Sequence, residues 1–208
     1  MSCKARCNFC CICCISSTIY AIIFILVLFS IIFWIVISPS NVTFGVTEAS
    51  LTQFNLTSNN TLYYNFKVNI TVINPNNNVI VYYRGIKAIA WYKDNDFAWV
   101  NLTPFDQGHK NTSFLQAVFN GQSVIKLKDK QLGQYKEETN VGIYSDLAVD
   151  LDLRIRAKLG RFKSSRFNPP IVQCRRLRVP LISNGKSTPT FNVTQCSTGS
   201  FFVDRDAS

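Results

Sequence analysis

An uninterrupted apolar run near the amino end is the feature that most constrains what this chain can fold into. From Ile19 to Ile37 the residues read IYAIIFILVLFSIIFWIVI, with Ser30 as the clearly polar member and no charged residue. As a helix rising 1.5 Å per residue, the run would be about 28 Å long, close to the thickness of a bilayer's hydrocarbon core. Backbone groups in that layer must bond within their own segment. The sequence therefore predicts one transmembrane helix at 19–38.

Flanking charges indicate the direction of this helix. Lys4 and Arg6 precede it, and the first basic residue after it is Lys67. Because positively charged flanks remain cytosolic, we expect a cytosolic tail at 1–18 and an extracellular remainder. A buried helix of a soluble core is one alternative. A cleaved signal peptide is another, although its apolar stretch is normally about 7–15 residues long and ends at a small-residue cleavage site.

Six cysteines gather in the tail that precedes the apolar run. Thiols on the cytosolic side of a membrane helix are suited to palmitoylation, and each buried CH₂ group contributes about 0.8 kcal/mol to membrane binding. Zinc binding is an alternative, but the spacing offers no histidine and no second pair of ligands at knuckle spacing. Unmodified, reduced thiols are the third interpretation. The cysteines predicted to be acylated are Cys3, Cys7, Cys10, Cys11, Cys13 and Cys14.

The remainder of the chain contains more N-x-[ST] sequons than its composition would give by chance. Since glycans are added on the secreted side, this excess favours an extracellular location, although an Asn-rich chain can also carry accidental sequons. Asn41 is expected to lie too close to the bilayer for modification, and Pro104 makes Asn101 a poorer acceptor. The predicted glycosylation sites are Asn55, Asn59, Asn69, Asn101, Asn111 and Asn192.

Alternation of apolar and polar residues dominates after residue 41. Residues 64–72 alternate in this way, and residues 147–159 are apolar at seven successive odd positions. An antiparallel strand with one solvated face explains that pattern, whereas a helix does not. Seven or eight strands predict an all-β sandwich at 41–200, followed by a tail at 201–208. The shorter expected strands are 42–46, 79–83, 86–92, 114–119 and 124–127, separated by turn residues at 74–76, 94–96, 108 and 120–121.

Two cysteines lie on the expected extracellular side, and we expect them to form a disulfide. Asn184 and Gly185 favour a hairpin turn between two short alternating runs. If residue i faces residue 370 − i, Cys174 meets Cys196, and Leu177 meets Val193. This register predicts a disulfide between neighbouring strands, on the face opposite the apolar one.

Three motifs follow one another between residues 42 and 196. The first is Asn74-Pro75-Asn76 followed by Val81-Tyr82-Tyr83, the second is Pro104-Phe105-Asp106-Gln107-Gly108-His109-Lys110-Asn111-Thr112, and the third is Cys174-Arg175-Arg176-Leu177-Arg178-Val179-Pro180-Leu181 with Cys196. Together they resemble the plant harpin-induced and non-race-specific-disease-resistance-like family, over residues 42–196. Where the family usually has an acidic residue after the paired tyrosines, this chain has Arg84. The resemblance implies a late-embryogenesis-abundant group 2 sandwich similar to fibronectin type III. It also implies a plasma-membrane protein, often at plasmodesmata, linked to pathogen defence and abiotic stress, with no enzymatic activity established.

The motif residues themselves indicate turns and contacts rather than catalysis. Pro75 forces Asn74 out of the helical region, and asparagine side chains bond turn backbone. A contact surface is the alternative for this motif. Tyr82 and Tyr83 must face opposite sides of a strand, one toward the core. The single histidine, His109, has no partner histidine or nucleophile in the pattern, so we expect a loop histidine, no enzyme, and no metal or cofactor.

The net charge of +10 is confined to one part of the chain. Between Leu153 and Val203 there is no acidic residue, while basic and acidic residues balance elsewhere. On neighbouring strands such residues form a patch that attracts polyanions and weakens with salt, unless they are only a solvated face. The expected partners are acidic wall polysaccharide or anionic lipid headgroups, and unidentified proteins, but not nucleic acid. A membrane-tethered module that binds lipid between its sheets is the alternative function. The predicted patch residues are Arg154, Arg156, Lys158, Arg175, Arg176 and Arg178.

Overall fold

The computed structural model describes residues 17–31, 39–182 and 191–207. The chain divides into two compact units, Met1–Pro39 and Ser40–Ser208. In the first unit, residues 17–31 form a helix with exposed side chains. Within the described part of the chain, no helix combines the length and apolar character needed to cross a membrane. The predicted span at 19–38 extends beyond the described residues, and the six tail cysteines lie outside them, so both stay predictions.

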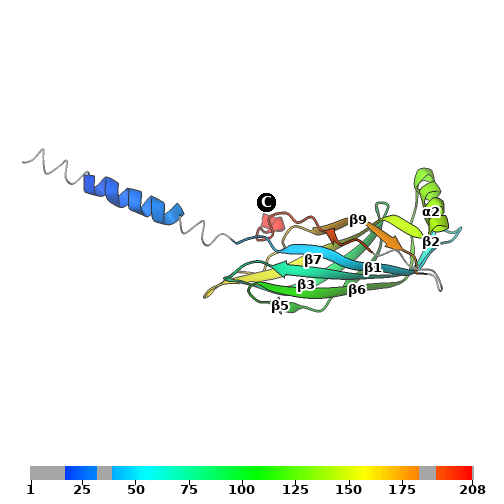
Figure 1. The fold of residues 1–208 in the computed structure, drawn as a ribbon, viewed down its shortest axis with the longest axis horizontal. Coiled ribbons are helices and arrows are strands. Elements are labelled where there is room, and N and C mark those ends of the chain that lie inside the picture. Colours follow the sequence, from blue (N-terminus) through cyan, green and yellow to red (C-terminus); the bar gives the residue numbers. More distant parts are fainter. Residues whose placement is uncertain (1–16, 32–38, 183–190, 208) are drawn as a thin grey trace, which may run out of the picture. The chain divides into compact units, whose positions relative to one another are not determined.

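The second unit is a mostly-β, sandwich-like fold of two antiparallel sheets (Figure 1), as the alternation predicts. One sheet has the order β10–β1–β2–β6, with bounds Thr194–Gln195, Thr43–Leu56, Thr61–Asn74 and Asn111–Val124. The other is built on β3 (Val79–Tyr92) and β7 (Ile143–Leu159). Strands β4 (Asn95–Asn101) and β5 (Phe105–Gln107) pair with β3, while β8 (Phe162–Lys163) and β9 (Val172–Pro180) pair with β7. The remaining elements are α2 (Asp129–Val141) and a 3-10 helix at Arg205–Ala207.

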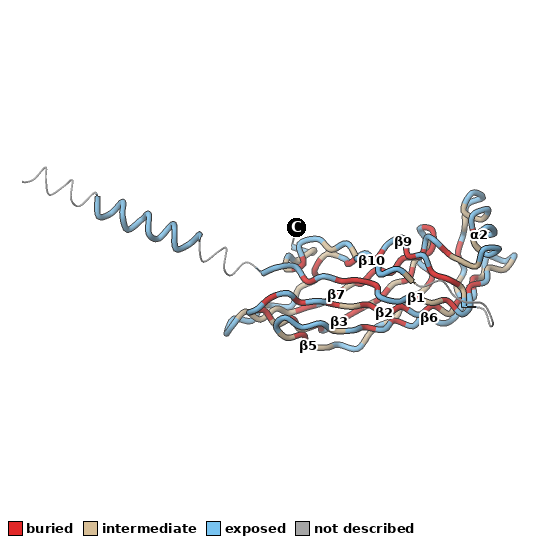
Figure 2. The backbone as a smooth tube through the Cα atoms, in the orientation of Figure 1, coloured by how far each residue is buried: buried red, intermediate tan, exposed pale blue. Residues whose placement is uncertain are grey.

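Buried and exposed residues alternate along the central strands, as Figure 2 shows. On β2 every predicted inward residue from Tyr64 to Val72 is buried, and on β7 the inward residues from Leu147 to Ile155 are buried too. These side chains meet aromatic rings from the opposite sheet; Phe66 and Phe97, for example, have ring centroids 6.5 Å apart. The space between the sheets is therefore filled by side chains.

Two expected boundaries within strands are wrong. The segments expected at 79–83 and 86–92 form the single strand β3, which has a bulge between Tyr83 and Gly85. Inward positions change from odd to even across this bulge, because the extra residue reverses the side-chain alternation. The turn expected at 120–121 lies inside β6, where a Cβ on Gly121 would lie 3.3 Å from the Tyr64 hydroxyl oxygen, a tight contact.

Helix α2 was not expected, and the strand predicted at 124–127 is wrong beyond Val124. The helix has almost no apolar face, and Tyr135 is its buried residue. Its sequence signals are instead at its ends. The Gln131 side chain accepts a hydrogen bond from the Lys128 backbone N–H at 3.0 Å, and Gly142 ends the helix in the left-handed conformation.

Strand β9 departs from the predicted hairpin. Leu177 pairs with Leu147 of β7, and Val193 is exposed, so the two do not meet; residues 184–185 lie outside the described residues. Arg176 has a φ of 58° and interrupts the alternation. Cys174 is consequently buried on the same face as Leu177, not on the opposite face as predicted.

The predicted disulfide is confirmed, because Cys174 and Cys196 are bonded with Cα atoms 4.3 Å apart. Gln173 and Ser197 form an antiparallel bridge beside it. This pair and the disulfide fit the expected register, in which residue i faces residue 370 − i. Among the described residues, the other expected pairs of the hairpin do not form. The Cys196 backbone N–H donates to the carbonyl oxygen of Phe44 in β1. The disulfide therefore joins the edge of one sheet to the other sheet rather than two strands of a hairpin.

Candidate functional site

Residues of the first two motifs meet at one end of the sandwich. Asn74 is fully buried, and its Nδ2 donates to the carbonyl oxygens of Val79 and Gly108, at 2.8 Å each. Its Oδ1 accepts from the backbone N–H of Asn76 at 3.1 Å. The turn at 74–76 is thus confirmed, and the side chain of Asn74 also fastens the turn to the second motif.

Gln107 is the second buried polar residue at this end. Its Nε2 donates to the carbonyl oxygens of Val72 and Asn111, and its Oε1 accepts from the Tyr83 hydroxyl at 3.2 Å. The Tyr83 ring stacks on Phe105 with centroids 4.4 Å apart, and burial raises the pKa of Tyr83. These polar groups satisfy one another, so both motifs serve to hold backbone segments together.

The exposed motif residues lie around this buried network. Pro75 and Pro104 are exposed, as is His109, which lies in the turn between β5 and β6. The Lys110 backbone N–H donates to the carbonyl oxygen of Asn76 at 3.0 Å, and Lys110 has a φ of 42°. This bond adds a second link between the two motifs.

Tyr82 faces away from the core, opposite to Tyr83, as predicted. Two cations lie against its ring, with the Arg84 guanidinium 5.1 Å and the Lys163 Nζ 4.7 Å from the centroid. Arg84 also forms an ion pair with Asp106 at 2.9 Å. The basic residue that replaces the usual acidic one is therefore matched by a carboxylate of the second motif.

The predicted basic residues lie in two separate groups along β7. One, the β7–β8 group, consists of the predicted residues Arg154, Arg156 and Lys158, joined by Lys163 of β8, which was not among the predicted patch residues. The register pairs Arg156 with Tyr82 and Lys158 with Lys163. The other, the β9 group, consists of Arg175, Arg176 and Arg178, beside the opposite half of β7. Two aspartates of β7 lie between the groups.

These two aspartates are paired with arginines. Asp150 was expected on a solvated face, but it is buried and bonds Arg175 at 2.9 Å. Burial raises the pKa of Asp150, and the charge of Arg175 opposes that effect. Asp152 bonds Arg205 at 3.2 Å. The sequence shows both aspartates but not the register that places the β9 group beside the part of β7 that precedes them.

Surface hollows flank the β9 group. Arg176 and Arg178 line a hollow of about 320 Å³, together with residues such as Phe191 and Asn192. Arg175 and Arg176 line a second hollow of about 410 Å³, whose wall includes Trp91. The Arg175 guanidinium lies 5.7 Å from the centroid of the Trp91 ring. Trp91 is half-buried, and Asp94 and Asp146 also line this second hollow. The arginines that line the hollows are suited to binding a carboxylated ligand.

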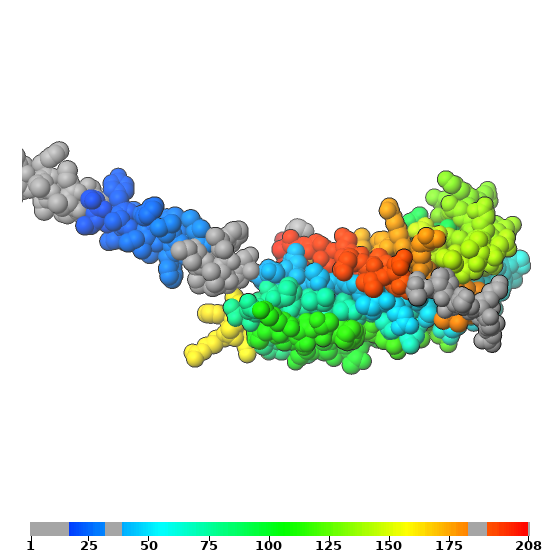
Figure 3. Space-filling view, viewed as in Figure 1, coloured from blue at the N-terminus to red at the C-terminus, as the bar shows by residue number. Residues whose placement is uncertain are grey.

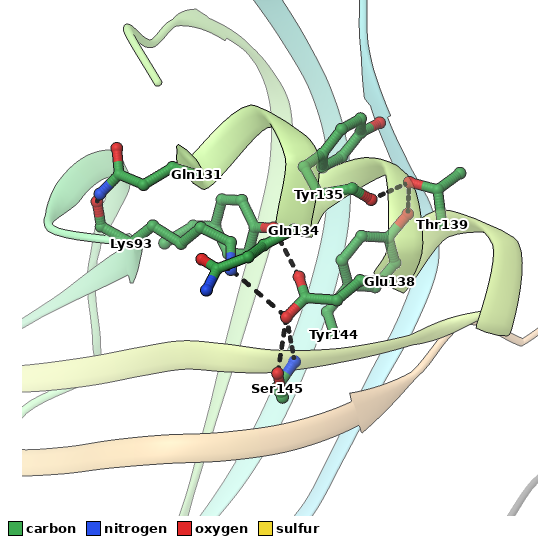
Figure 4. Close-up of polar contacts among 9 residues, drawn as sticks. Lys93, Gln131, Gln134, Tyr135, Glu138, Thr139, Tyr144 and Ser145 are labelled. Atoms are coloured by element: carbon green, nitrogen blue, oxygen red, sulfur yellow. Dashed lines mark hydrogen bonds and ion pairs between the residues drawn. The ribbon is translucent and has the colours of Figure 1, made fainter. Parts of the chain in front are cut away.

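A polar cluster holds α2 against the other end of the sandwich (Figure 4). The Glu138 carboxylate accepts from the Tyr92 hydroxyl and the Ser145 hydroxyl, at 2.6 Å each, and forms an ion pair with Lys93 at 3.4 Å. Burial raises the pKa of Glu138, but the bonds from Ser145 and Tyr92 and the charge of Lys93 together hold it below its usual value. The predictions missed this cluster because α2 was not expected.

Most predicted glycosylation sites are exposed. Asn69 is the half-buried one, and its amide donates to Glu48 at 2.7 Å and accepts from Gln116 at 3.0 Å. Asn41 is exposed and accepts from the Phe201 backbone N–H. Modification of these residues stays a prediction. The exposed predicted sites are Asn55, Asn59, Asn101, Asn111 and Asn192.

Comparisons with known proteins find close relatives in Arabidopsis thaliana. NDR1/HIN1-like protein 10 is 39% identical over 188 residues, covering 88% of this chain and 82% of the relative. NDR1/HIN1-like protein 3 is 39% identical, covering 80% and 71%, and NDR1/HIN1-like protein 2 is 36% identical, covering 80% and 69%. No protein-family model matches the chain. A solved protein from Archaeoglobus fulgidus overlaps 65% of this chain and 95% of its own, but at 13% identity and a TM-score of 0.26 it supports no argument.

Proposed function

This chain belongs to the NDR1/HIN1-like family of plant proteins, and from that premise we propose that it is a membrane-tethered surface protein of plant defence and stress responses that acts by binding. The family membership supports the association with defence and stress. The sandwich, of late-embryogenesis-abundant group 2 type, is the binding part, and residues 19–38 are the tether. The tether is supported by the apolar run, and the tail cysteines beside it are suited to acylation.

An extracellular location for the sandwich is supported by the exposed sequons and by the disulfide, which persists in oxidising compartments. The cheapest test is endoglycosidase treatment of protein from intact plant cells, together with protease added to sealed protoplasts. We expect a mobility shift in the first experiment and loss of the sandwich in the second. An unshifted, protease-protected chain would contradict the proposed topology.

We propose that the β9 group binds acidic wall polysaccharide. The observation that carries this proposal is that Arg176 lines both hollows, one shared with Arg178 and the other with Arg175 and Trp91. Guanidinium groups pair bidentately with carboxylates. Three neighbouring arginines make binding dependent on salt.

Binding to polygalacturonate tests this proposal. The full chain in nanodiscs is compared at low and high salt with the double variant Arg176→Glu/Arg178→Glu. Lys67→Glu/Lys126→Glu is the matched control, because it makes the same charge change at exposed residues away from β9. We expect binding that weakens with salt, at least tenfold loss in the β9 variant, and little loss in the control. Equal losses in both variants would mean that net charge alone acts, and salt-independent binding would contradict the proposal.

The alternative, a tethered module that holds lipid or another apolar ligand between its sheets, has less support. Most inward side chains of β2, β3 and β7 are buried and fill the space that such a ligand would need. A clustered basic surface over a filled core favours surface binding.

A further inference from the structure

The turn between β7 and β8 presents an exposed aromatic ring. Leu159 pairs with Phe162, and Gly160, with a φ of 55°, and Arg161 form the tight turn between them. Phe162 is 83% exposed, more than any other large hydrophobic residue in the described part of the chain. A single exposed apolar residue needs no explanation by itself, so its surroundings decide whether it has a role.

Those surroundings are basic. Arg161 and Lys163, on either side of Phe162, are exposed, and Lys158 pairs with Lys163 across the hairpin. The sequence contains no acidic residue from Leu153 to Val203. The Lys163 Nζ lies over the Tyr82 ring, which positions the base of the hairpin on the sheet. At the tip, an exposed apolar side chain is therefore surrounded by positively charged side chains.

The tip lies at the end of the sandwich where the polypeptide enters it from residues 1–39. Ser40 is bound to Asn76 in the turn before β3, and Val79, the first residue of β3, pairs with Leu159 at the base of the tip. In Figure 1 the yellow turn after β7 lies at the end where β1 begins, opposite α2. Figure 3 shows the yellow part of the chain projecting from this end.

We propose that this tip docks onto the lipid surface of the membrane in which the chain is anchored. Phe162 enters the headgroup region, while Arg161 and Lys163 contact lipid phosphates. A convex apolar point in a basic ring suits a lipid interface, because lipids deform around it and need no complementary pocket. The inference rests on the proposed membrane tether, since the tether brings this end of the sandwich to the bilayer.

Photo-crosslinking in the full chain tests the proposal. The chain carries p-benzoylphenylalanine in place of Phe162, or in place of Phe114, and is mixed with vesicles of phosphatidylcholine with or without phosphatidylserine. Phe114 is the matched control, because it is an equally large ring, 77% exposed, on the outer face of β6. Lipid adducts are quantified by mass spectrometry, and retention of the chain after an alkaline wash is measured on the same samples.

We expect at least fivefold more lipid adducts at position 162 than at 114, with a further increase when phosphatidylserine is present. The added double variant Arg161→Ala/Lys163→Ala should reduce adducts at 162 at least threefold. Equal adduct levels at 162 and 114 would overturn docking by the tip, even if the chain resists the alkaline wash. If the alkaline wash removed the chain from the vesicles, the membrane tether would be contradicted instead. The ratio of lipid adducts at positions 162 and 114 would still test whether the tip docks.

Discussion

Asn76 and Ser40 are joined by two hydrogen bonds of equal length. The Ser40 backbone N–H donates to Oδ1 of Asn76, and the Asn76 Nδ2 donates to the carbonyl oxygen of Ser40, both at 2.7 Å. The same Nδ2 donates to Oδ1 of Asn74 at 2.9 Å. The motif at 74–76 thus fastens the first residue of the sandwich to its buried polar network.

Replacing Asn76 should loosen that attachment. Asn76→Ala leaves the Ser40 backbone groups and Oδ1 of Asn74 without these bonds, and we expect a loss of about 2 kcal/mol in the free energy of unfolding. Urea unfolding measures the loss. Asn77→Ala is the control at an exposed neighbour and should change stability by less than about 0.5 kcal/mol. Similar effects in both variants would show that the bonds to Ser40 contribute little.

The Glu138 cluster should make stability depend on pH. Its hydrogen bonds and Lys93 hold the pKa of Glu138 below the usual value. A carboxyl group with a lower pKa in the folded state than in the unfolded state stabilises the fold above its unfolded pKa of about 4.3. That stabilisation is lost as the pH falls through the folded pKa.

Glu138→Gln is expected to remove this dependence. We expect a loss of about 2 kcal/mol at pH 7, less than for a fully buried pair because the site is partly solvated, and a smaller loss at pH 3. Unfolding in urea at both pH values measures it. Glu137→Gln is the matched control on the exposed side of α2. A loss that is equal at the two pH values would rule out ionised Glu138 as the source.

Two glycines of α2 should respond oppositely to alanine. Gly142 ends the helix at a φ of 77°, and its N–H donates to the Glu138 carbonyl oxygen at 2.7 Å, so Gly142→Ala should cost about 1 kcal/mol. Gly133 lies inside the helix, where a Cβ would meet no atom within 4 Å. Gly133→Ala should therefore stabilise by about 0.5–1 kcal/mol. Thermal unfolding shows whether each variant is more or less stable than the native chain. A change in the same direction in both variants would contradict the assignment of the helix end.

The disulfide between the two sheets should contribute about 3 kcal/mol, mainly by restricting the unfolded chain. We expect Cys174→Ala/Cys196→Ala to lower the unfolding free energy by about this amount. Dithiothreitol should destabilise the native chain and leave the double variant unchanged, although both retain the tail cysteines. A variant that unfolds like the oxidised native chain would show that the bond adds no stability.

The sequence identified the central strands because local alternation alone carries that information. Residues 64–72 and 147–159 form parts of β2 and β7 with the predicted buried faces. It also identified the turn at 74–76, where proline and asparagine act locally, and the pairing of Cys174 with Cys196. In β9 the apolar residues change from even positions (172 and 174) to odd positions (177 and 179), which indicates a bulge. The prediction assumed strict alternation and therefore missed this bulge.

Local sequence patterns did not predict helix α2, and they did not predict that the basic residues form two separate groups. A polar helix such as α2 is stabilised by contacts such as Tyr135 with the backbone of Leu56, at 2.8 Å and 79 residues away. The periodicity of apolar residues in the local sequence carries no information about such a long-range contact. The basic residues were predicted to form one patch, although Asp150 and Asp152 lie in the same strand as Arg154, because the sequence does not show where β9 aligns along β7.

The amino-acid order by itself determined the central strands at 64–72 and 147–159, their apolar faces, and the pairing of Cys174 with Cys196. The tertiary structure alone decided that Asn74 reaches Gly108, that Asp150 meets Arg175, and that Phe162 stands at the same end as Ser40. The reason is physical: side-chain periodicity reports only the environment on each side of a strand. Contacts between distant segments depend on strand order, register and bulges, which packing of the whole sandwich selects.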